Sequence, residues 1–269
     1  MVKAIVMGAA GKMGSRIATL ISGTEGIEIA GAVEKKGHPL IGRDIGDHTG
    51  IGKTGVSIAG DISDYIKKGD VIIDFTHHEA SIANLEAAVG NNKAIVIGTT
   101  GFSADEMKTI RELAKKTRCV LAPNMSVGVN VMFKVLENVA GILGDEFDVE
   151  IVEAHHNLKK DAPSGTAMRM AQIIADVLKR NLDKVAVYER KGMVGARTRA
   201  EIGIQTVRAG DIVGEHTVIF GGIGERLEFI HRAHSRDNFA KGAIRAAKWI
   251  VNQKNGFYDM QDVLGLKDR

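Results

Sequence analysis

The residues best suited to chemistry lie in the segment EIVEAHHNLKKDAPSGTA, from Glu150 to Ala167. His155 is suited to proton transfer because imidazole titrates near neutral pH. Lys159 adds a fixed cation and a potential proton donor. Ser164-Gly165-Thr166 then opens a helical pattern, where hydroxyls can cap the helix and free N–H groups can bind an anion. This combination predicts proton transfer to an anionic substrate.

Simpler explanations exist for the same residues. His155 and His156 could be ordinary core or surface residues, and Lys159 with Lys160 could be a solvated loop. The two histidines could also bind a metal, but neighbours on a strand point to opposite faces and cannot easily reach one ion. The density of reactive types over 18 residues argues against all three together. We predict no metal site, and no catalytic role for the similar pair His77-His78.

A second site is predicted at the amino terminus, where glycines separate an apolar run at 2–7 from a helical pattern. Gly8 can make a tight turn, Gly11 can admit a pyrophosphate, and Gly14 can allow close helix–strand contact. The spacing is G-x-x-G-x-x-G rather than the stricter G-x-G-x-x-G. Its place between strand and helix favours a dinucleotide site over a purely structural turn.

Glu34 ends the second predicted strand, and its carboxylate can accept hydrogen bonds from an adenosine ribose, which favours NAD. Lys35 follows and could accommodate the 2′-phosphate of NADP, or could be a surface charge. We therefore expect use of both NADH and NADPH. The segments GTTG at 98–101 and APNMS at 122–126 follow two further strands. They could be loops on the nicotinamide side of the cofactor or ordinary turns between strand and helix.

The first half alternates apolar runs with helical patterns, which predicts a Rossmann-type parallel sheet with helices on both faces. Residues 34–60 are expected to form a long loop with room for one short strand. The predicted strands are 2–7, 27–33, 70–75, 94–98 and 118–122, and the helices are 13–21, 79–90 and 103–116.

The pattern changes near residue 126 to that of an α+β domain with a mixed sheet. We predict a dinucleotide-binding domain of residues 1–126 and 236–269, with the last helix packed back on it. Residues 127–235 would form a substrate-binding and oligomerisation domain joined by short hinges. Its predicted helices are 128–143 and 164–179, and its strands are 147–155, 185–190, 200–208, 215–221 and 226–234.

Composition excludes several classes of protein. Of 269 residues, 44% are hydrophobic and 26% charged, which is typical of a folded protein. With 4% aromatic residues and a dispersed net charge of +3, nucleic-acid binding is not indicated. The single cysteine, Cys119, excludes a disulfide framework. We found no apolar run long enough to cross a membrane and no signal peptide, so we expect a cytoplasmic protein without a membrane partner.

The segment at 150–167 closely resembles the signature of dihydrodipicolinate reductases, also called 4-hydroxy-tetrahydrodipicolinate reductases, of the diaminopimelate route to lysine. The resemblance spans the whole chain. The blocks that agree are GAAGKMG at 8–14, IDFTHHEA at 73–80, IGTTGF at 97–102, APNMSVGVNVM at 122–132, TVRAGDIVGEHTVIF at 206–220, GERLE at 224–228 and YDMQDVL at 258–264.

The resemblance implies reduction of a cyclic unsaturated dicarboxylate to tetrahydrodipicolinate by NADH or NADPH, and assembly as a homotetramer. Because cofactor and substrate are assigned to different domains, we also expect hinge closure to bring them together. It makes His155 the proton donor, Lys159 its partner, and His156, Gly165 and Thr166 substrate-binding residues. Lys35 stands where some members have Arg. The implied cofactor positions are Gly8, Ala9, Ala10, Gly11, Lys12, Met13, Glu34, Gly98, Thr99, Thr100, Ala122, Pro123, Asn124 and Met125.

Three other functions compete. Another two-domain Rossmann dehydrogenase is one, but a thioester-forming semialdehyde enzyme needs a reactive cysteine, and Cys119 lies in an apolar strand. A non-catalytic NAD(P) sensor would need the glycine turn but not the segment from His155 to Thr166. A metal-dependent hydrolase lacks support, because no H-E-x-x-H spacing is present.

Overall fold

The computed structural model describes residues 1–267; Asp268 and Arg269, which the predicted cofactor domain includes, lie outside the described residues. The chain forms two compact units. Unit 1 consists of Met1–Val127 and Asp237–Arg269, and unit 2 of Gly128–Arg236.

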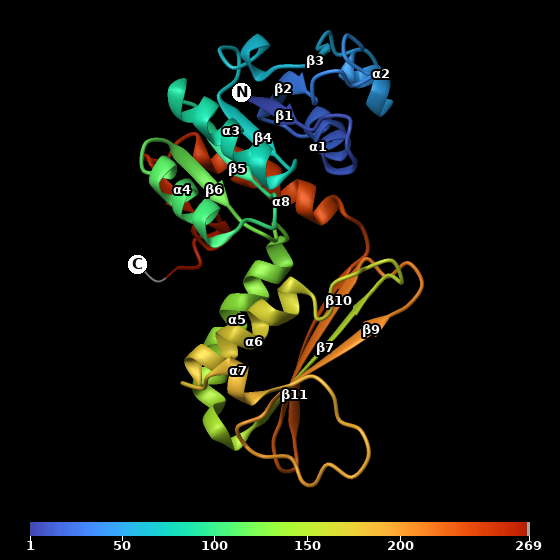
Figure 1. Ribbon diagram of the computed structural model, residues 1–269, viewed down its shortest axis with the longest axis vertical. Helices are drawn as coiled ribbons and strands as arrows, with labels where there is room; N and C mark the ends of the chain where they lie inside the picture. Colours follow the sequence, from blue (N-terminus) through green and yellow to red (C-terminus); the bar gives the residue numbers. More distant parts are fainter. Residues whose placement is uncertain (268–269) are drawn as a thin grey trace. The chain divides into compact units, whose positions relative to one another are not determined.

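Unit 1 is built on a seven-stranded sheet in the order β12-β6-β5-β4-β1-β2-β3, with all pairs parallel (Figure 1). The central strands are apolar throughout because helices cover both faces. The strand order reverses between β1 and β4, which is where ligands bind in such sheets, outside the carboxyl ends. The strands are β1 (Val2–Met7), β2 (Ile27–Val33), β3 (Ile58–Ala59), β4 (Val71–Asp74), β5 (Ala94–Ile97), β6 (Arg118–Leu121) and β12 (Gly256–Tyr258).

Two layers of helices enclose this sheet. α1 (Lys12–Ser22) and α8 (Asp237–Ile250) pack together on one face, and α3 (His78–Gly90) and α4 (Ala104–Ala114) cover the other. The buried side of α8 consists largely of alanines, which allow its backbone to approach the strands closely. Although α8 follows unit 2 in the chain, its apolar side lies in the core of unit 1. The short helix α9 (Met260–Leu264) completes this unit.

The predicted loop at 34–60 contains a helix that the sequence analysis missed, α2 (Ile45–Thr49), besides the short strand β3. One carboxylate organises this segment: Asp44 accepts hydrogen bonds from the N–H groups of Gly46, Thr54 and Gly55. These bonds lower the pKa of Asp44 to about 2. Elements this short depend on such side-chain contacts, which hydrophobic periodicity does not reveal.

Unit 2 pairs two long helices with a mixed five-stranded sheet in the order β11-β10-β7-β9-β8. β10 is antiparallel to β7 and β11, whereas β9 is parallel to β7 and β8. The strand expected at 185–190 is reduced to two residues after the short helix α7. The elements are α5 (Val127–Leu143), β7 (Asp148–His155), α6 (Gly165–Val177), α7 (Leu182–Val185), β8 (Ala186–Val187), β9 (Ile202–Arg208), β10 (Gly214–Gly221) and β11 (Arg226–Ala233).

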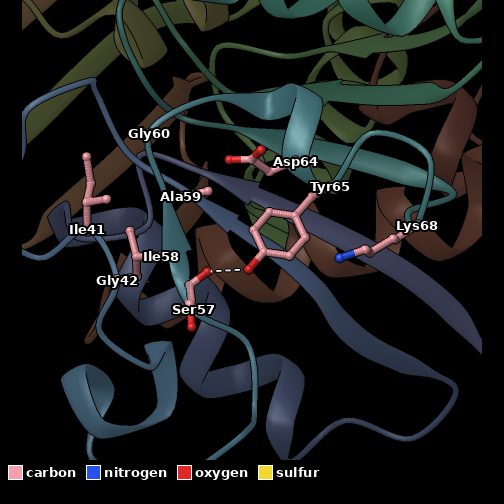
Figure 2. Close-up of a pocket in the computed structure, with 9 residues that line it drawn as sticks. All are labelled: Ile41, Gly42, Ser57, Ile58, Ala59, Gly60, Asp64, Tyr65 and Lys68. Carbon is pink, nitrogen blue, oxygen red and sulfur yellow. Dashed lines mark hydrogen bonds between the residues drawn. The ribbon is translucent and has the colours of Figure 1, made fainter.

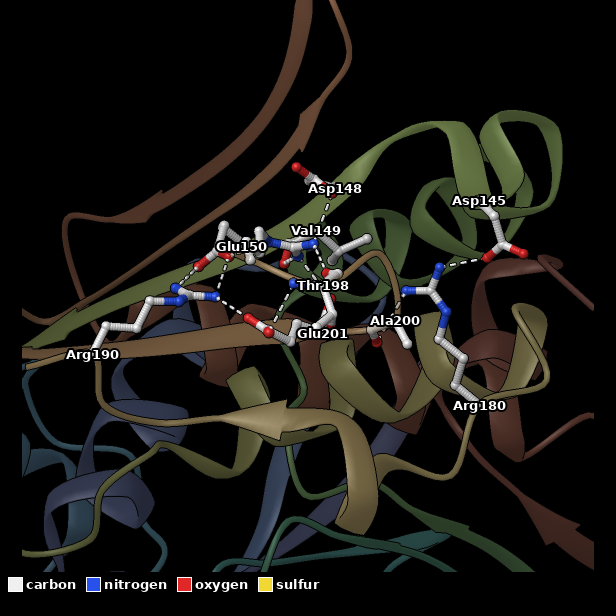
Figure 3. A network of polar contacts seen from close by, with 10 residues as sticks. Asp145, Asp148, Val149, Glu150, Arg180, Arg190, Thr198, Ala200 and Glu201 are labelled. Atoms are coloured by element: carbon white, nitrogen blue, oxygen red, sulfur yellow. Dashed lines mark hydrogen bonds and ion pairs between the residues drawn. The ribbon is translucent and has the colours of Figure 1, made fainter. Parts of the chain in front are cut away.

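The helices of unit 2 lie on one face of this sheet and leave the other open (Figure 1). On the open face, the Glu150 carboxylate binds both Arg190 and Arg197, and the absence of a side chain at Gly203 leaves room for it. Arg197 also donates to the backbone carbonyls of Val149, Thr198 and Glu201 (Figure 3). This network ties the long segment between β8 and β9 to the sheet.

One helical stretch, Val127–Glu146, is long and apolar enough to cross a membrane by length and composition, with a mean hydropathy of 1.3. The expectation that no segment meets these criteria was therefore wrong. Core helices of globular proteins meet them as well. The face of this helix that carries Val129, Met132 and Leu136 lies in the core of unit 2.

Gly14 sits where α1 crosses the turn after β1, and a Cβ atom there would lie 2.0 Å from the carbonyl oxygen of Gly8. To make room for it, the backbone of α1 at residue 14 or that of the turn at Gly8 and Ala9 would have to move. We expect Gly14→Ala to lower the free energy of unfolding by about 1–3 kcal/mol, measured by urea unfolding with the single tryptophan, Trp249, as reporter. In Gly23→Ala, at the open C-cap of the same helix, stability should stay equal or rise slightly. Equal stability of the two variants would contradict this packing argument.

Candidate active site

The glycine turn is closed by backbone contacts. Gly8 adopts a φ of +61°, a conformation that favours glycine, and its carbonyl accepts a hydrogen bond from the N–H of Gly11. Gly11 is the N-cap residue of α1, and no side chain caps the first N–H groups of this helix. A helix start of this kind presents N–H donors and a positive dipole end to an anion. The structure therefore contains the strand–turn–helix expected of a phosphate-binding turn.

Glu34 lies directly against this turn. One carboxylate oxygen accepts a hydrogen bond from the N–H of Ala10 at 3.1 Å, and the other from the N–H of Lys35 at 2.9 Å. The carboxylate is half-buried, whereas the Lys35 side chain is exposed. The structure thus brings Glu34 together with the predicted residues at 8–13.

The two later loops follow β5 and β6 at the same end of the sheet. Gly98 is needed for packing, because a Cβ atom there would lie 2.2 Å from the ring of Phe75. Thr99 is buried and accepts a hydrogen bond from the Ser81 hydroxyl, while Thr100 is exposed. Met125 is also buried, beneath α8. In the second loop, Ala122 is likewise buried, Asn124 is half-buried and Pro123 is exposed.

A pocket of about 440 Å³ lies elsewhere in unit 1, between Ile41, β3 and the segment from Asp64 to Lys68 (Figure 2). The Tyr65 hydroxyl crosses it to donate a hydrogen bond to the carbonyl of Ser57 at 2.6 Å. None of the predicted site residues line this pocket. Its location therefore does not bear on their roles.

In unit 2 the predicted donor His155 belongs to a network around Glu153, which is fully buried. The His155 ring contacts this carboxylate through Nδ1 at 2.6 Å. Both terminal nitrogens of Arg208 donate to it, at 2.8 and 2.9 Å, as does the N–H of Ser164 at 2.9 Å. The Thr206 hydroxyl adds a weaker contact at 3.3 Å.

These contacts determine the charge of Glu153 and the tautomer of His155. Burial alone would raise the pKa of Glu153, but the hydrogen bonds from Arg208, His155 and Ser164 outweigh it and lower this pKa. The ionised carboxylate accepts a hydrogen bond from Nδ1–H, which leaves Nε2 as the ring atom that exchanges protons. Nε2 points toward Gly214, where a Cβ atom would approach it to 3.1 Å.

The pKa of His155 is lowered, mainly by burial. Glu153 opposes this shift, whereas the charges of Lys159 and Arg208 add to it. The site by itself therefore favours the neutral imidazole at pH 7. The imidazolium expected from the sequence requires an added negative charge, such as that of a bound dicarboxylate.

The loop after β7 carries the other predicted residues. The Lys159 ammonium binds both oxygens of Asp161, at 2.8 and 2.7 Å, and this contact lowers the pKa of Asp161. The backbone of the loop is tied down by the hydrogen bond from Asn157 N–H to the carbonyl of Gly210. His156 is half-buried just beyond the end of β7.

Helix α6 begins beside His155. Ser164 caps it by accepting a hydrogen bond from the N–H of Ala167, as expected, and its hydroxyl also contacts Nε2 of His216 at 3.0 Å. Gly165 at the first helical position has open space where a side chain would be, and Thr166 is half-buried. The strand end, the loop and the helix start of the predicted segment thus form one site in unit 2.

His216 forms a further wall of this site. Its ring lies edge-on to that of His155, with the centroids 5.3 Å apart. Burial first, and then the nearby charge of His155, lower the pKa of His216 to about 3. His216 is therefore neutral at pH 7 and contributes shape and hydrogen bonding rather than charge.

Sequence reasoning missed Glu153, Asp161, Arg208 and His216. Glu153 had a signal, because residues two apart on a strand share a face and His155 was already singled out. Arg208 pairs with His155 and His216 pairs with Glu153 across the sheet. Those partners depend on strand register, which the sequence does not reveal.

The structure also bears on the alternatives that involve a reactive cysteine or a metal site. Cys119 is fully buried, and burial raises the pKa of its thiol to about 12, which makes it unsuitable as a nucleophile. Within residues 1–267, no group of three or more His, Cys, Asp or Glu side chains is placed to hold a metal ion. Nδ1 of His78 contacts the Glu106 carboxylate at 2.6 Å, so this histidine has a structural contact.

Comparisons with known proteins agree along the whole chain. The family described as "Dihydrodipicolinate reductase, N-terminus" matches residues 2–125, and "Dihydrodipicolinate reductase, C-terminus" matches residues 128–264. A 4-hydroxy-tetrahydrodipicolinate reductase of Syntrophus aciditrophicus is 64% identical over 99% of this chain and 100% of its own length. Its counterpart in Geotalea uraniireducens is 58% identical over the same shares.

Solved structures agree as well. The dipicolinate-bound dihydrodipicolinate reductase from Paenisporosarcina sp. TG-14 has a TM-score of 0.75 and 26% identity, covering 97% of this chain and 98% of its own. An amine dehydrogenase from Mycobacterium smegmatis, with a TM-score of 0.60 and 15% identity over 100% of this chain and 97% of its own, shares the fold. Full-length identity above 50% and two matching halves show that this chain belongs to the dihydrodipicolinate reductase family.

Proposed function

We propose that this chain reduces 4-hydroxy-tetrahydrodipicolinate, or the dehydrated dihydrodipicolinate, to tetrahydrodipicolinate in the diaminopimelate route to lysine. Family membership supports the activity, and the dipicolinate of the related solved structure supports a dicarboxylate ligand. The observation that carries the proposal is the contact of His155 with buried Glu153, beside Lys159 and the start of α6. This arrangement places a proton donor, His155, next to groups that bind anions, namely Lys159 and the N–H groups at the start of α6.

Unit 1 is proposed to bind the cofactor. The turn at Gly8 to Met13 fits a pyrophosphate, because its backbone is exposed at the start of α1 and carries no capping side chain. Glu34 would accept hydrogen bonds from the adenosine ribose of NADH, and exposed Lys35 would tolerate the 2′-phosphate of NADPH. We place the loops at 98–100 and 122–125 on the nicotinamide side. When bound, the cofactor supplies the hydride.

His155 would deliver the proton. Hydride addition to the conjugated carbon–nitrogen system of the ring leaves an electron-rich enamine, and protonation of a neighbouring carbon completes the reduction. Glu153 holds the Nδ1–H of His155, so Nε2–H is the donor. The substrate dianion raises the pKa of His155 from its low value in the free site, and binding thereby charges the acid that the reaction needs.

The anionic groups of the substrate would be held by cations and N–H donors. Lys159 is bound to Asp161 in this structure, and a substrate carboxylate is the same type of partner. The helix start at Gly165 and Thr166 would bind the second carboxylate, with His156 at the edge. Gly165 suits this role because the space where a side chain would lie is open.

Assembly as a cytoplasmic homotetramer is part of the proposal. The sheet of unit 2 is covered by helices on one face, while Val207 and Ile230 expose 42% and 45% of their surface on the other. Exposed apolar side chains on an uncovered sheet face favour a subunit contact. The free cysteine suits a reducing compartment.

Replacement of the proposed proton donor and its partner tests the reaction. We expect His155→Ala and Lys159→Ala to lower kcat by about 10² to 10⁴, with NADH affinity nearly unchanged, as measured by loss of NADH absorbance with enzymatically generated substrate and repeated with NADPH. Lys115→Ala is the matched control, because Lys115, just after the end of α4, binds Glu112 in the same two-oxygen manner. Wild-type turnover in both site variants would refute the assignment.

The pH dependence follows from the direction of the His155 shift. A general acid is lost as the pH rises through its pKa, and this pKa is low in the free site and higher in the substrate complex. The alkaline limb of kcat/KM, which reports the free enzyme, should therefore lie at lower pH than the alkaline limb of kcat. Coincident limbs in a full pH series would argue against charging of His155 by the substrate.

Sedimentation velocity of the full-length chain at micromolar concentration should show a tetramer. Replacing Val207 or Ile230 by Asp, which puts a charge on the uncovered face, should shift the distribution toward smaller species. A monomer in the wild-type protein would overturn the proposed assembly.

A further inference from the structure

All four terminal N–H groups of the Arg208 guanidinium are used, and they connect separate parts of the site. Two donate to the two oxygens of Glu153 on β7. One donates to the carbonyl of Asp161, in the loop that carries Lys159, at 2.6 Å. The last donates to the carbonyl of Val207 beside it on β9, which directs the side chain across the sheet.

We propose that Arg208 is a positioning residue that holds His155 and the Lys159 loop in one arrangement, by binding the Glu153 carboxylate and the Asp161 carbonyl at the same time. The inference rests on the proposed function for the roles of His155 and Lys159. The Arg208 guanidinium donates no hydrogen bond to the His155 ring; it acts through Glu153, which the ring contacts, and through the backbone of Asp161, whose carboxylate binds Lys159.

A second consequence concerns charge. The groups that face His155 are Glu153 on its own strand, Arg208 on β9, His216 on β10, and Lys159 in the loop, with Asp161 behind Lys159. His216 is neutral, so Glu153 and Arg208 are the paired charges closest to the ring along the sheet. The charge of Arg208 acts against that of Glu153 and in the same direction as burial and Lys159, which favours release of the proton from the imidazolium once it has formed.

The geometry requires arginine. A guanidinium presents a rigid planar fork that can bind two carboxylate oxygens and still donate sideways, whereas an ammonium is a compact point charge. Arg208→Lys therefore keeps the positive charge but loses the link between strand and loop. Arg208→Gln loses both. The two variants separate the positioning effect from the charge effect.

The experiment measures kcat and the His155 pKa in the same full-length proteins. The pKa is read from histidine Cε1–H NMR titration without substrate, with His155→Gln identifying the resonance. We expect both Arg208 variants to lower kcat by about 10-fold to 100-fold, with little change in KM for NADH. The His155 pKa should rise in Arg208→Gln, stay near the wild-type value in Arg208→Lys, and fall in Glu153→Gln.

Arg180→Gln is the matched control. Arg180 also lies in unit 2 and also binds one carboxylate, Asp145, and one backbone carbonyl, Ala200, but it is not part of this network. It should leave both kcat and the His155 pKa unchanged. If Arg208→Gln fails to fold, Arg208→Lys and Glu153→Gln still decide the question.

Wild-type kcat in Arg208→Lys, or shifts of the His155 pKa in the same direction in Arg208→Gln and Glu153→Gln, would overturn the inference. A structural defect alone would not move one pKa in opposite directions. Because the titration needs no substrate, failure of the inference can be told apart from failure of the proposed reaction, which would appear as an inactive wild-type protein with the expected pKa shifts.

Discussion

A carboxylate buried without partners would be strongly destabilising, and Glu153 is fully buried. Its partners come from three places: the strand it stands on, the neighbouring strand β9, and the backbone N–H of Ser164 at the start of α6. Its partner Arg208 also binds the Asp161 carbonyl in the loop after β7. Satisfying one charge thus brings the strand end, the loop and the helix start together. The arrangement of the site in unit 2 follows from this requirement, with His155 oriented as part of it.

Unit 1 meets a different demand by different means. A phosphate-binding turn needs bare backbone, and three glycines let β1, the turn and α1 approach so closely that one added methyl group at Gly14 would overlap a carbonyl. Glu34 is held against that turn by a backbone N–H rather than by a cation. Unit 1 therefore relies on backbone donors, which suit a phosphate ligand. Unit 2 relies on a side-chain network, which suits proton transfer.

Arginine–carboxylate networks occur on both faces of the sheet in unit 2, with different consequences. On the open face, Arg190 and Arg197 bind Glu150 and tie a long connection to the sheet (Figure 3). On the helix-covered face, Arg208 binds Glu153 next to His155. The chemistry of the pairs is the same. The face on which each lies decides whether it organises a connection or a titrating histidine.

Much of this protein could be predicted from local pattern. Alternating apolar runs and helices indicated the parallel sheet, the glycine spacing indicated the turn, and the density of reactive residues between His155 and Thr166 located the site, because these signals lie within short stretches of chain. Arg208 and His216 are 53 and 61 residues beyond His155, and they reach it only through the register of β9 and β10 on β7. The short elements α2 and β12 also went unpredicted, since three to five residues are held by tertiary contacts rather than by periodicity. Local sequence thus determined which residues can do chemistry, whereas strand pairing decided which neighbours set their charge and orientation, because hydrogen bonds across a sheet join residues that are distant in the chain.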